Sequence, residues 1–155
     1  TIHSAFSLPL DEIHLMTLPP RHCHRLFERY KHEEEMDFLM KQLINLNQNR
    51  LYIIGSNQMG TMISLPSLLK KKTLSYQSVF LIDEEGADLI DGGDYLCVTY
   101  RGNYEQSAYW GQQLAQYAHA HKFTIRGDLL EILWIDIHTT SDESEYITQL
   151  QLPIA

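Results

Sequence analysis

The sequence predicts an α+β domain that has a mostly antiparallel sheet, two main helices and a duplicated βαββ unit with pseudo-twofold symmetry. Apolar residues alternate with a period of two in some segments and recur at helical spacing in two others. The order strand–helix–strand–strand occurs once before an acidic, glycine-containing loop and once after it. We therefore expect half-repeats over about 11–86 and 91–155, a tail over 1–10, and a ligand pocket at the seam between the halves.

The first half opens with an extended segment. Mixed alternation around a Pro-Pro pair predicts a bent strand over 11–30. Apolar residues at helical spacing, with three glutamates in the first turn, predict a helix over 32–49. A short apolar strand at 50–57, a Met- and Leu-rich loop with a short helical turn at 57–75, and a strand at 76–83 complete the half.

The second half repeats this order. A strand is predicted over 94–102, and a helix over 103–122, with Asn103 as a plausible N-cap. Two strands are predicted over 129–138 and 145–154. Small residues dominate one stripe of the helix, which allows a close approach to the sheet: Ala108, Gly111, Leu114, Ala115 and Ala118.

Composition narrows the classes of function. Twelve basic and twenty acidic residues give a formal charge of −8, which disfavours direct contact with nucleic acid. The basic run at 70–72 is short and is interpreted as a solvated loop. No run of about 18 apolar residues is present, so no membrane span is expected. Two distant cysteines favour a reducing compartment, the cytoplasm, and the start at Thr1 favours a fragment of a longer protein.

Motifs for nucleotide binding and catalysis are missing from the sequence. It contains no P-loop, no G-x-G-x-x-G and no G-x-S-x-G. The histidine pairs His22/His24 and His119/His121 lack the i, i+4 spacing of a helical zinc site. We therefore predict no cofactor, no metal site and no catalytic residue, and we expect a binding module rather than an enzyme.

Glu131 is the residue that the strand pattern does not explain. It falls in the same alternating register as Leu133, Ile135 and Ile137, so an acid shares a strand face with aliphatic residues. A buried, unpaired carboxylate costs several kcal/mol, so the group pairs, takes up a proton or waits for a cation. The alternative is an edge position where Glu131 reaches water or an arginine such as Arg126.

Aromatic residues concentrate in the second half of the chain. The members there are Tyr95, Tyr100, Tyr104, Tyr109, Trp110, Tyr117, Trp134 and Tyr146. A carboxylate among aromatic rings is suited to a lipophilic cation, because the rings supply cation–π and dispersion contacts while the acid supplies charge. Any single ring could instead be an ordinary core or surface residue.

The second half resembles the GyrI-like (gyrase-inhibitor-like) effector-binding domain. The resembling segments are "DGGDYLCVTYRGNYEQSAYWGQQLAQYAHAHKFTIRGDLLEILWID" and the closing strand "EYITQLQLPI". The resemblance implies that 11–155 form one such domain, in which Glu131 is the counter-charge of the ligand, Tyr146 lies beside it and Tyr100 is nearby. Trp110, Tyr52 and Trp134 are added as candidate lining residues without support from the family pattern.

The resemblance also implies a function. Domains of this kind bind effectors in bacterial transcriptional regulators of the MerR and AraC types. We therefore expect a cationic, lipophilic or aromatic ligand, with DNA binding and dimerisation carried by segments outside this chain. Two alternatives stay open: a stand-alone hydrolase of electrophilic natural products that uses Glu131 as acid or base, and a gyrase-inhibitor-like module that binds protein.

Overall fold

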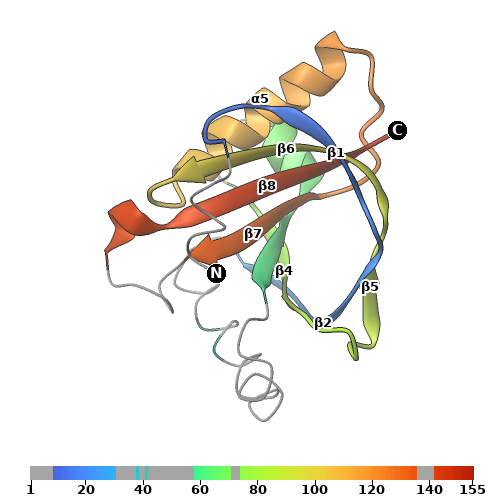
Figure 1. Cartoon of the computed structure of the whole chain (residues 1–155), viewed down its shortest axis with the longest axis vertical. Helices are drawn as coiled ribbons and strands as arrows, with labels where there is room; N and C mark the ends of the chain where they lie inside the picture. The colour runs from blue at the N-terminus through green and yellow to red at the C-terminus, as the bar shows by residue number, and fades with distance from the viewer. Residues whose placement is uncertain (1–8, 31–37, 39–40, 42–57, 71–73, 136–141) are drawn as a thin grey trace.

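A curled antiparallel sheet with helix α5 across one face dominates the computed structural model of this chain (Figure 1). The structure describes residues 9–30, 38, 41, 58–70, 74–135 and 142–155. Within these residues, no helix is long and apolar enough to cross a membrane. The elements, in chain order, are β1 His14–Leu18, β2 Arg21–Tyr30, β3 Met59–Ile63, α4 Leu65–Leu69, β4 Tyr76–Ile82, β5 Asp88–Ile90, β6 Gly93–Arg101, α5 Gln106–Ala120, β7 Leu129–Ile135, the 3₁₀ helix η1 Glu143–Glu145, and β8 Ile147–Ile154.

The order of the strands has an internal symmetry. The eight strands lie in the order β1-β6-β8-β7-β3-β4-β2-β5, and exchanging each strand n with strand n+4 reproduces the same order reversed. The pair β3–β7 forms the centre of this symmetry, and the short strands β1 and β5 pair with β6 and β2, respectively. A duplicated unit would have this topology, but most of the helix predicted for the first half lies outside the described residues, so the duplication stays a prediction.

Several predicted elements are confirmed. The bent strand over 11–30 is two strands, β1 and β2, separated at the Pro-Pro pair. The strands over 76–83, 94–102 and 145–154 correspond to β4, β6 and β8. The predicted helix over 32–49 lies outside the described residues except for Phe38 and Lys41, which are helical, and the predicted strand over 50–57 also lies outside them.

Two predictions about loops were wrong. The segment 57–75 contains the central strand β3 as well as the short helix α4, and the acidic loop after β4 contains the three-residue strand β5. Gly60 lowers the strand propensity of the β3 segment, so the sequence alone does not indicate a strand there. The glycine is needed because a Cβ at this position would lie 2.4 Å from Phe80 Cζ. The packing of β3 between β4 and β7 therefore overrides its weak intrinsic preference for a strand.

Helix α5 begins later than predicted. Its N-cap is Glu105 rather than Asn103, and the Asn103 side-chain oxygen instead accepts a hydrogen bond from the Glu105 amide at 3.1 Å. The buried stripe of α5 is Ser107, Gly111, Leu114, Ala115 and Ala118. A Cβ on Gly111 would lie 2.7 Å from Leu68 Cδ1, so the glycine permits the close contact between α5 and α4.

The two faces of the sheet carry separate apolar clusters. The cluster on the helix side contains Leu129 and Leu133 of β7, and the cluster on the other side contains Leu130 and Ile132. This split follows from the alternation of side chains along the strand. Because Glu131 lies between Leu130 and Ile132 in sequence, it shares the helix-side face with Leu129 and Leu133.

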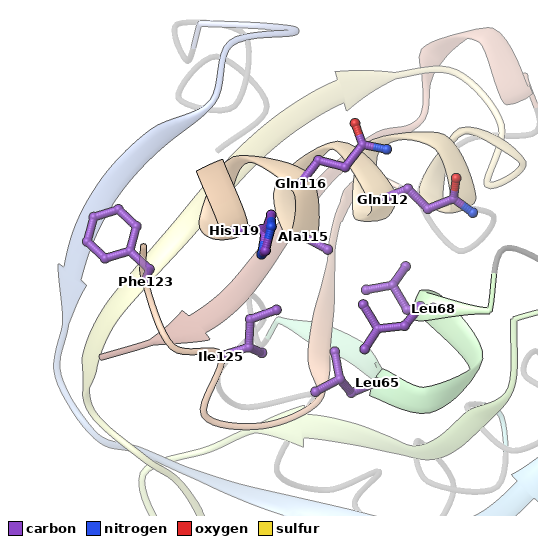
Figure 2. A pocket seen from close by; sticks show the side chains of 9 residues that line it. Leu65, Leu68, Gln112, Ala115, Gln116, His119, Phe123 and Ile125 are labelled. Atoms are coloured by element: carbon purple, nitrogen blue, oxygen red, sulfur yellow. The ribbon is translucent and has the colours of Figure 1, made fainter. Parts of the chain in front are cut away.

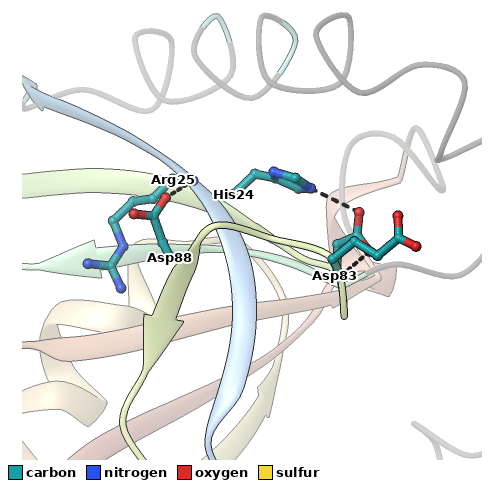
Figure 3. A network of polar contacts seen from close by, with 5 residues as sticks. His24, Arg25, Asp83 and Asp88 are labelled. Carbon is teal, nitrogen blue, oxygen red and sulfur yellow. Dashed lines mark hydrogen bonds and ion pairs between the residues drawn. The ribbon is translucent and has the colours of Figure 1, made fainter.

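Polar contacts fasten the turn between β4 and β5 to β2 (Figure 3). His24 Nε2 lies 2.9 Å from Asp83 Oδ2, and the Arg25 amide donates to Asp88 Oδ2 at 3.1 Å. The other oxygen of Asp83 accepts from the amide of Glu85 at 3.1 Å. These bonds fix the short connection that leads into β5 and the second half of the sheet.

Candidate functional site

Glu131 lies at the junction between the two halves of the sheet. It is directly opposite Thr61 in the antiparallel pair of β7 with β3, and its side chain is 0% exposed. The prediction that the acid is hidden from solvent is therefore confirmed. Burial of a carboxylate at this position requires hydrogen-bonding partners, because the charged form loses its water shell.

Two hydroxyl groups donate hydrogen bonds to the carboxylate. Thr61 Oγ1 donates to Oε1 at 2.9 Å, and Ser107 Oγ, from the second residue of α5, donates to Oε2 at 2.5 Å. Tyr100 Oη lies 2.7 Å from the same Ser107 oxygen. Because the single proton of Ser107 is directed to Glu131, Tyr100 is the donor in this last bond.

These contacts place the carboxylate beside the N-terminal end of α5. The first turn of α5 carries the positive end of the helix dipole, and Ser107 holds the carboxylate beside that turn. The hydroxyls of Thr61 and Ser107 are neutral, so their two bonds occupy lone pairs without adding positive charge. Two neutral hydroxyls, one from β3 and one from the first turn of α5, thus donate to the carboxylate.

A group of tyrosines lies in the same apolar cluster, on the helix side of the sheet. Tyr104 and Tyr146 stack with ring centroids 5.3 Å apart and an angle of 24° between the ring planes. Both rings are nearly fully buried, and they share the cluster with Tyr100 and Leu133. The amide of Gly102 donates to the Tyr146 carbonyl at 2.9 Å, which ties the start of β8 to the end of β6.

Comparison with solved structures supports the fold. The EcmrR chain in the complex described as "EcmrR-DNA complex in EcmrR-RPo" superposes with a TM-score of 0.69 at 13% identity, over 92% of this chain and 57% of that one. This chain thus spans 57% of the length of that EcmrR chain. The isolated C-terminal domain of EcmrR gives a TM-score of 0.64 at 15% identity, over 93% and 97% of the two chains. The chain has the fold of a GyrI-like effector-binding domain.

Two further structures share this GyrI-like fold. A structure described as a hydrolase from Listeria innocua gives a TM-score of 0.60 at 11% identity, over 98% of this chain and 96% of that one. SAV2435, solved with bound tetraphenylphosphonium, gives 0.52 at 13% identity, over 93% and 94%. No family model and no curated protein sequence matches the chain.

The remaining predicted site residues have different locations in the fold. Trp110 is half-buried on α5, packs against the helix-side cluster and meets the Tyr109 ring edge-on, with centroids 5.0 Å apart. Trp134 packs instead against the cluster on the opposite face of the sheet, so β7 does not bring it to Glu131. Tyr52 lies outside the described residues. We therefore leave Trp134 out of the proposed site.

Arg126, the alternative partner considered for Glu131, is engaged elsewhere. Its Nε donates to the Ile154 carbonyl at 2.7 Å, and its Nη2 donates to the Asp94 carbonyl at 3.2 Å. Its guanidinium carbon lies 5.5 Å from the centroid of the Tyr95 ring. Arg126 thus links β6, β8 and the segment before β7 on the side of the sheet away from Glu131.

The sequence-based prediction missed Thr61, Ser107 and Tyr104. Thr61 carries no signal in the sequence because the residues of β3 do not resemble a strand. Ser107 lies four residues before Gly111, so extending the small-residue stripe back by one helical turn would have found it. Tyr104 was part of the aromatic group but carried no separate signal, because its contact with Tyr146 depends on tertiary structure.

Glu131 does not line either of two well-formed pockets whose walls are described residues. One, of about 500 Å³, lies between α4 and α5, and the other, of about 240 Å³, lies beside Tyr95 and Arg126. The ligand pocket that the sequence predicts at the seam therefore stays a prediction, supported by the position of Glu131 at the β3–β7 pair.

Proposed function

We propose that this chain is a small-molecule effector-binding domain of a bacterial transcriptional regulator, and that its effector is a lipophilic or aromatic cation. The observation that carries the proposal is the burial of Glu131 at the junction of the two halves. The helix-side cluster, on the same face of the sheet, includes the buried tyrosines Tyr100, Tyr104 and Tyr146, and Tyr100 is linked to Glu131 through Ser107. A buried acid near aromatic rings supplies the charge and the apolar surface that such a cation requires.

Two structural neighbours support the biological role. EcmrR, whose C-terminal domain has this fold, is seen in a complex with DNA, and this chain matches only part of that protein. By analogy, the DNA-binding part of our protein would lie on another segment. SAV2435 binds tetraphenylphosphonium, a lipophilic aromatic cation, which supports the same ligand class here.

The mechanism follows from the contacts of Glu131. Thr61 belongs to β3 in the first half and Ser107 to α5 in the second, so the carboxylate joins both halves through hydrogen bonds. A cation that pairs with Glu131 would compete with these hydroxyls and change how α5 is held against the sheet. A ligand that stabilises one arrangement over the other shifts the population of the regulator.

Calorimetric titration of Glu131→Gln tests the counter-charge. The probes are tetraphenylphosphonium and the neutral triphenylphosphine oxide. A carboxylate–cation pair contributes on the order of 1–3 kcal/mol after desolvation, so we expect cation affinity to fall roughly 5- to 150-fold. The neutral compound should lose less than twofold.

Glu105→Gln is the matched control. Glu105 is an exposed acid two residues before Ser107, and its substitution removes the same charge as Glu131→Gln. It should leave both affinities within about twofold. An equal loss for both probes in Glu131→Gln would show that the residue acts through structure and not through charge. Circular dichroism of each variant verifies that the fold is intact.

A second candidate function is the hydrolysis of an electrophilic compound. The hydrogen-bonded series Tyr100–Ser107–Glu131 favours it, because a carboxylate held in this way could serve as a general base for water. A neighbour of the same fold from Listeria innocua is described as a hydrolase. Turnover of an epoxide such as styrene oxide, measured with the parent chain and with Glu131→Gln, separates this function from binding alone.

A further inference from the structure

The α4–α5 pocket is a second concave site, lined by different residues from those around Glu131. It is an open hollow of about 500 Å³ between α4, α5 and the segment 123–125 (Figure 2). Its lining is mostly apolar and carries no Asp, Glu, Lys or Arg: Leu65, Leu68, Leu69, Gln112, Ala115, Gln116, His119, Phe123 and Ile125. The volume and composition fall in the range of sites that bind small organic molecules, roughly 300–1,000 Å³.

The α4 wall of this pocket is held in place before any ligand arrives. The amide of Leu65 donates to Asp128 Oδ1 at 3.0 Å, which anchors the start of α4 to the segment before β7. Ser67 Oγ donates to the Ser64 carbonyl at 2.8 Å and accepts from the Ser75 amide at 2.9 Å. A preformed wall reduces the ordering that binding requires, and this favours affinity.

The segment 123–125 forms a second fixed wall. Lys122 adopts a positive φ of 61°, which reverses the chain after α5, and the Phe123 amide then donates to the Ala118 carbonyl at 2.8 Å. Thr124 exchanges two backbone hydrogen bonds with Ala155, at 3.1 and 2.8 Å. Ile125 forms an isolated antiparallel bridge with Ile154, so this wall is attached to the end of β8.

The pocket is separate from the surroundings of Glu131. Leu68 lines the pocket, and its Cδ1 would lie 2.7 Å from a Cβ built on Gly111, so it fills the space next to α5. Ala115, at the centre of the α5 wall, is eight residues beyond Ser107, which corresponds to about 12 Å along the helix axis. Ligands in the two sites would therefore contact different residues.

The chemistry of the lining selects an uncharged ligand. A cation would find no carboxylate among the lining residues, and an anion would find no Lys or Arg there, with His119 as the one titratable side chain of the lining. The side-chain amides of Gln112 and Gln116 can donate or accept a hydrogen bond at the edge of an apolar space. We propose that the α4–α5 pocket binds neutral aromatic molecules of about two rings that carry one hydroxyl or amide group.

Three probes with the same ring system and different charges test this ligand class. They are 2-naphthol, which is neutral at pH 7, the anion 2-naphthoate, and the cation (2-naphthylmethyl)ammonium. Affinity is measured by calorimetry and by saturation-transfer NMR. We expect 2-naphthol to bind at least tenfold more tightly than either ion. Equal affinity for a charged probe, or no binding of 2-naphthol up to its solubility, overturns the proposal.

Adjacent glutamines on α5 provide a matched pair of variants that locates the ligand. Gln112 lines the pocket and Gln113 does not, although both are half-buried. Gln112→Trp should fill the pocket and weaken 2-naphthol binding at least tenfold, whereas Gln113→Trp should leave it within twofold. The same loss in both variants, or a loss in neither, would place the ligand elsewhere and overturn the assignment.

A second pair of variants does not depend on changes to α5. Leu69, on the rim of the pocket, and Leu15, on β1, are both 54% exposed, so a polar replacement should be tolerated at each. Leu69→Glu brings a carboxylate to the apolar rim and should weaken 2-naphthol binding at least fivefold. Leu15→Glu should leave the affinity unchanged, and a matching loss there would contradict the location.

Discussion

Replacing Ser107 with alanine removes the contact through which α5 holds Glu131. In the folded protein, Ser107 Oγ donates to the Glu131 carboxylate at 2.5 Å and accepts from Tyr100 Oη at 2.7 Å. All three side chains are 0% exposed, so water cannot take the place of the hydroxyl without rearrangement. The substitution should therefore lower the free energy of unfolding.

The magnitude follows from these two bonds. A hydrogen bond to a charged group contributes about 1.5–3 kcal/mol, and one between neutral groups contributes about 0.5–1.5 kcal/mol. Alanine recovers about 0.5 kcal/mol because it forms helices more readily than serine. We expect Ser107→Ala to lower the free energy of unfolding by about 1.5–4 kcal/mol.

Urea denaturation at pH 7, followed by circular dichroism, measures this loss from the transition midpoint and slope. The control is Ser144→Ala, in which an exposed serine loses a 2.7 Å bond to Asp142. Exposed substitutions of this kind change stability by less than about 0.5 kcal/mol. A loss that small in Ser107→Ala would refute the idea that Ser107 and Glu131 are energetically coupled.

Two further predictions concern buried positions away from Glu131. Burial raises the pKa of the Cys97 thiol from 9.0 to about 12. The stability that this group contributes is therefore complete below pH 9 and is lost as the pH rises toward 12. In urea titrations between about pH 8 and 11, the free energy of unfolding of Cys97→Val should decline less than that of the parent chain. Gly111→Ala places a Cβ 2.7 Å from Leu68 Cδ1 and 3.0 Å from Leu129 Cδ2. The resulting crowding costs about 1–3 kcal/mol and should outweigh the gain in helix propensity of about 1 kcal/mol. We expect the melting temperature in a calorimetric scan to fall by about 2–4 °C. A higher melting temperature would contradict the tight contact.

The burial of Glu131 could be predicted because a strand repeats every two residues. The acid keeps the register of Leu133, and the structure places both on the helix-side face. The same alternation argues against Trp134, which is three residues from Glu131 and therefore points to the other face.

The partners of Glu131 could not be predicted, because they depend on pairings that are remote in sequence. Thr61 is 70 residues away and meets Glu131 only through the register of β3 with β7. The residues of β3, with a glycine at its second position, give no strand signal of their own. Ser107 was the easier case, since one turn of helix separates it from Gly111 on the buried stripe.

The pairing of β1 with β6 and of β5 with β2 limits how this domain can move. The first strand of each half pairs with a strand of the other half, through five residue pairs between β1 and β6 and three between β5 and β2. The two halves are therefore hydrogen-bonded to each other at both outer edges of the sheet and at the central β3–β7 pair, so they cannot separate unless an edge strand loses its pairing. Within the described residues, a change in the curl of the sheet or a sliding of α5 over it would leave these edge pairings intact.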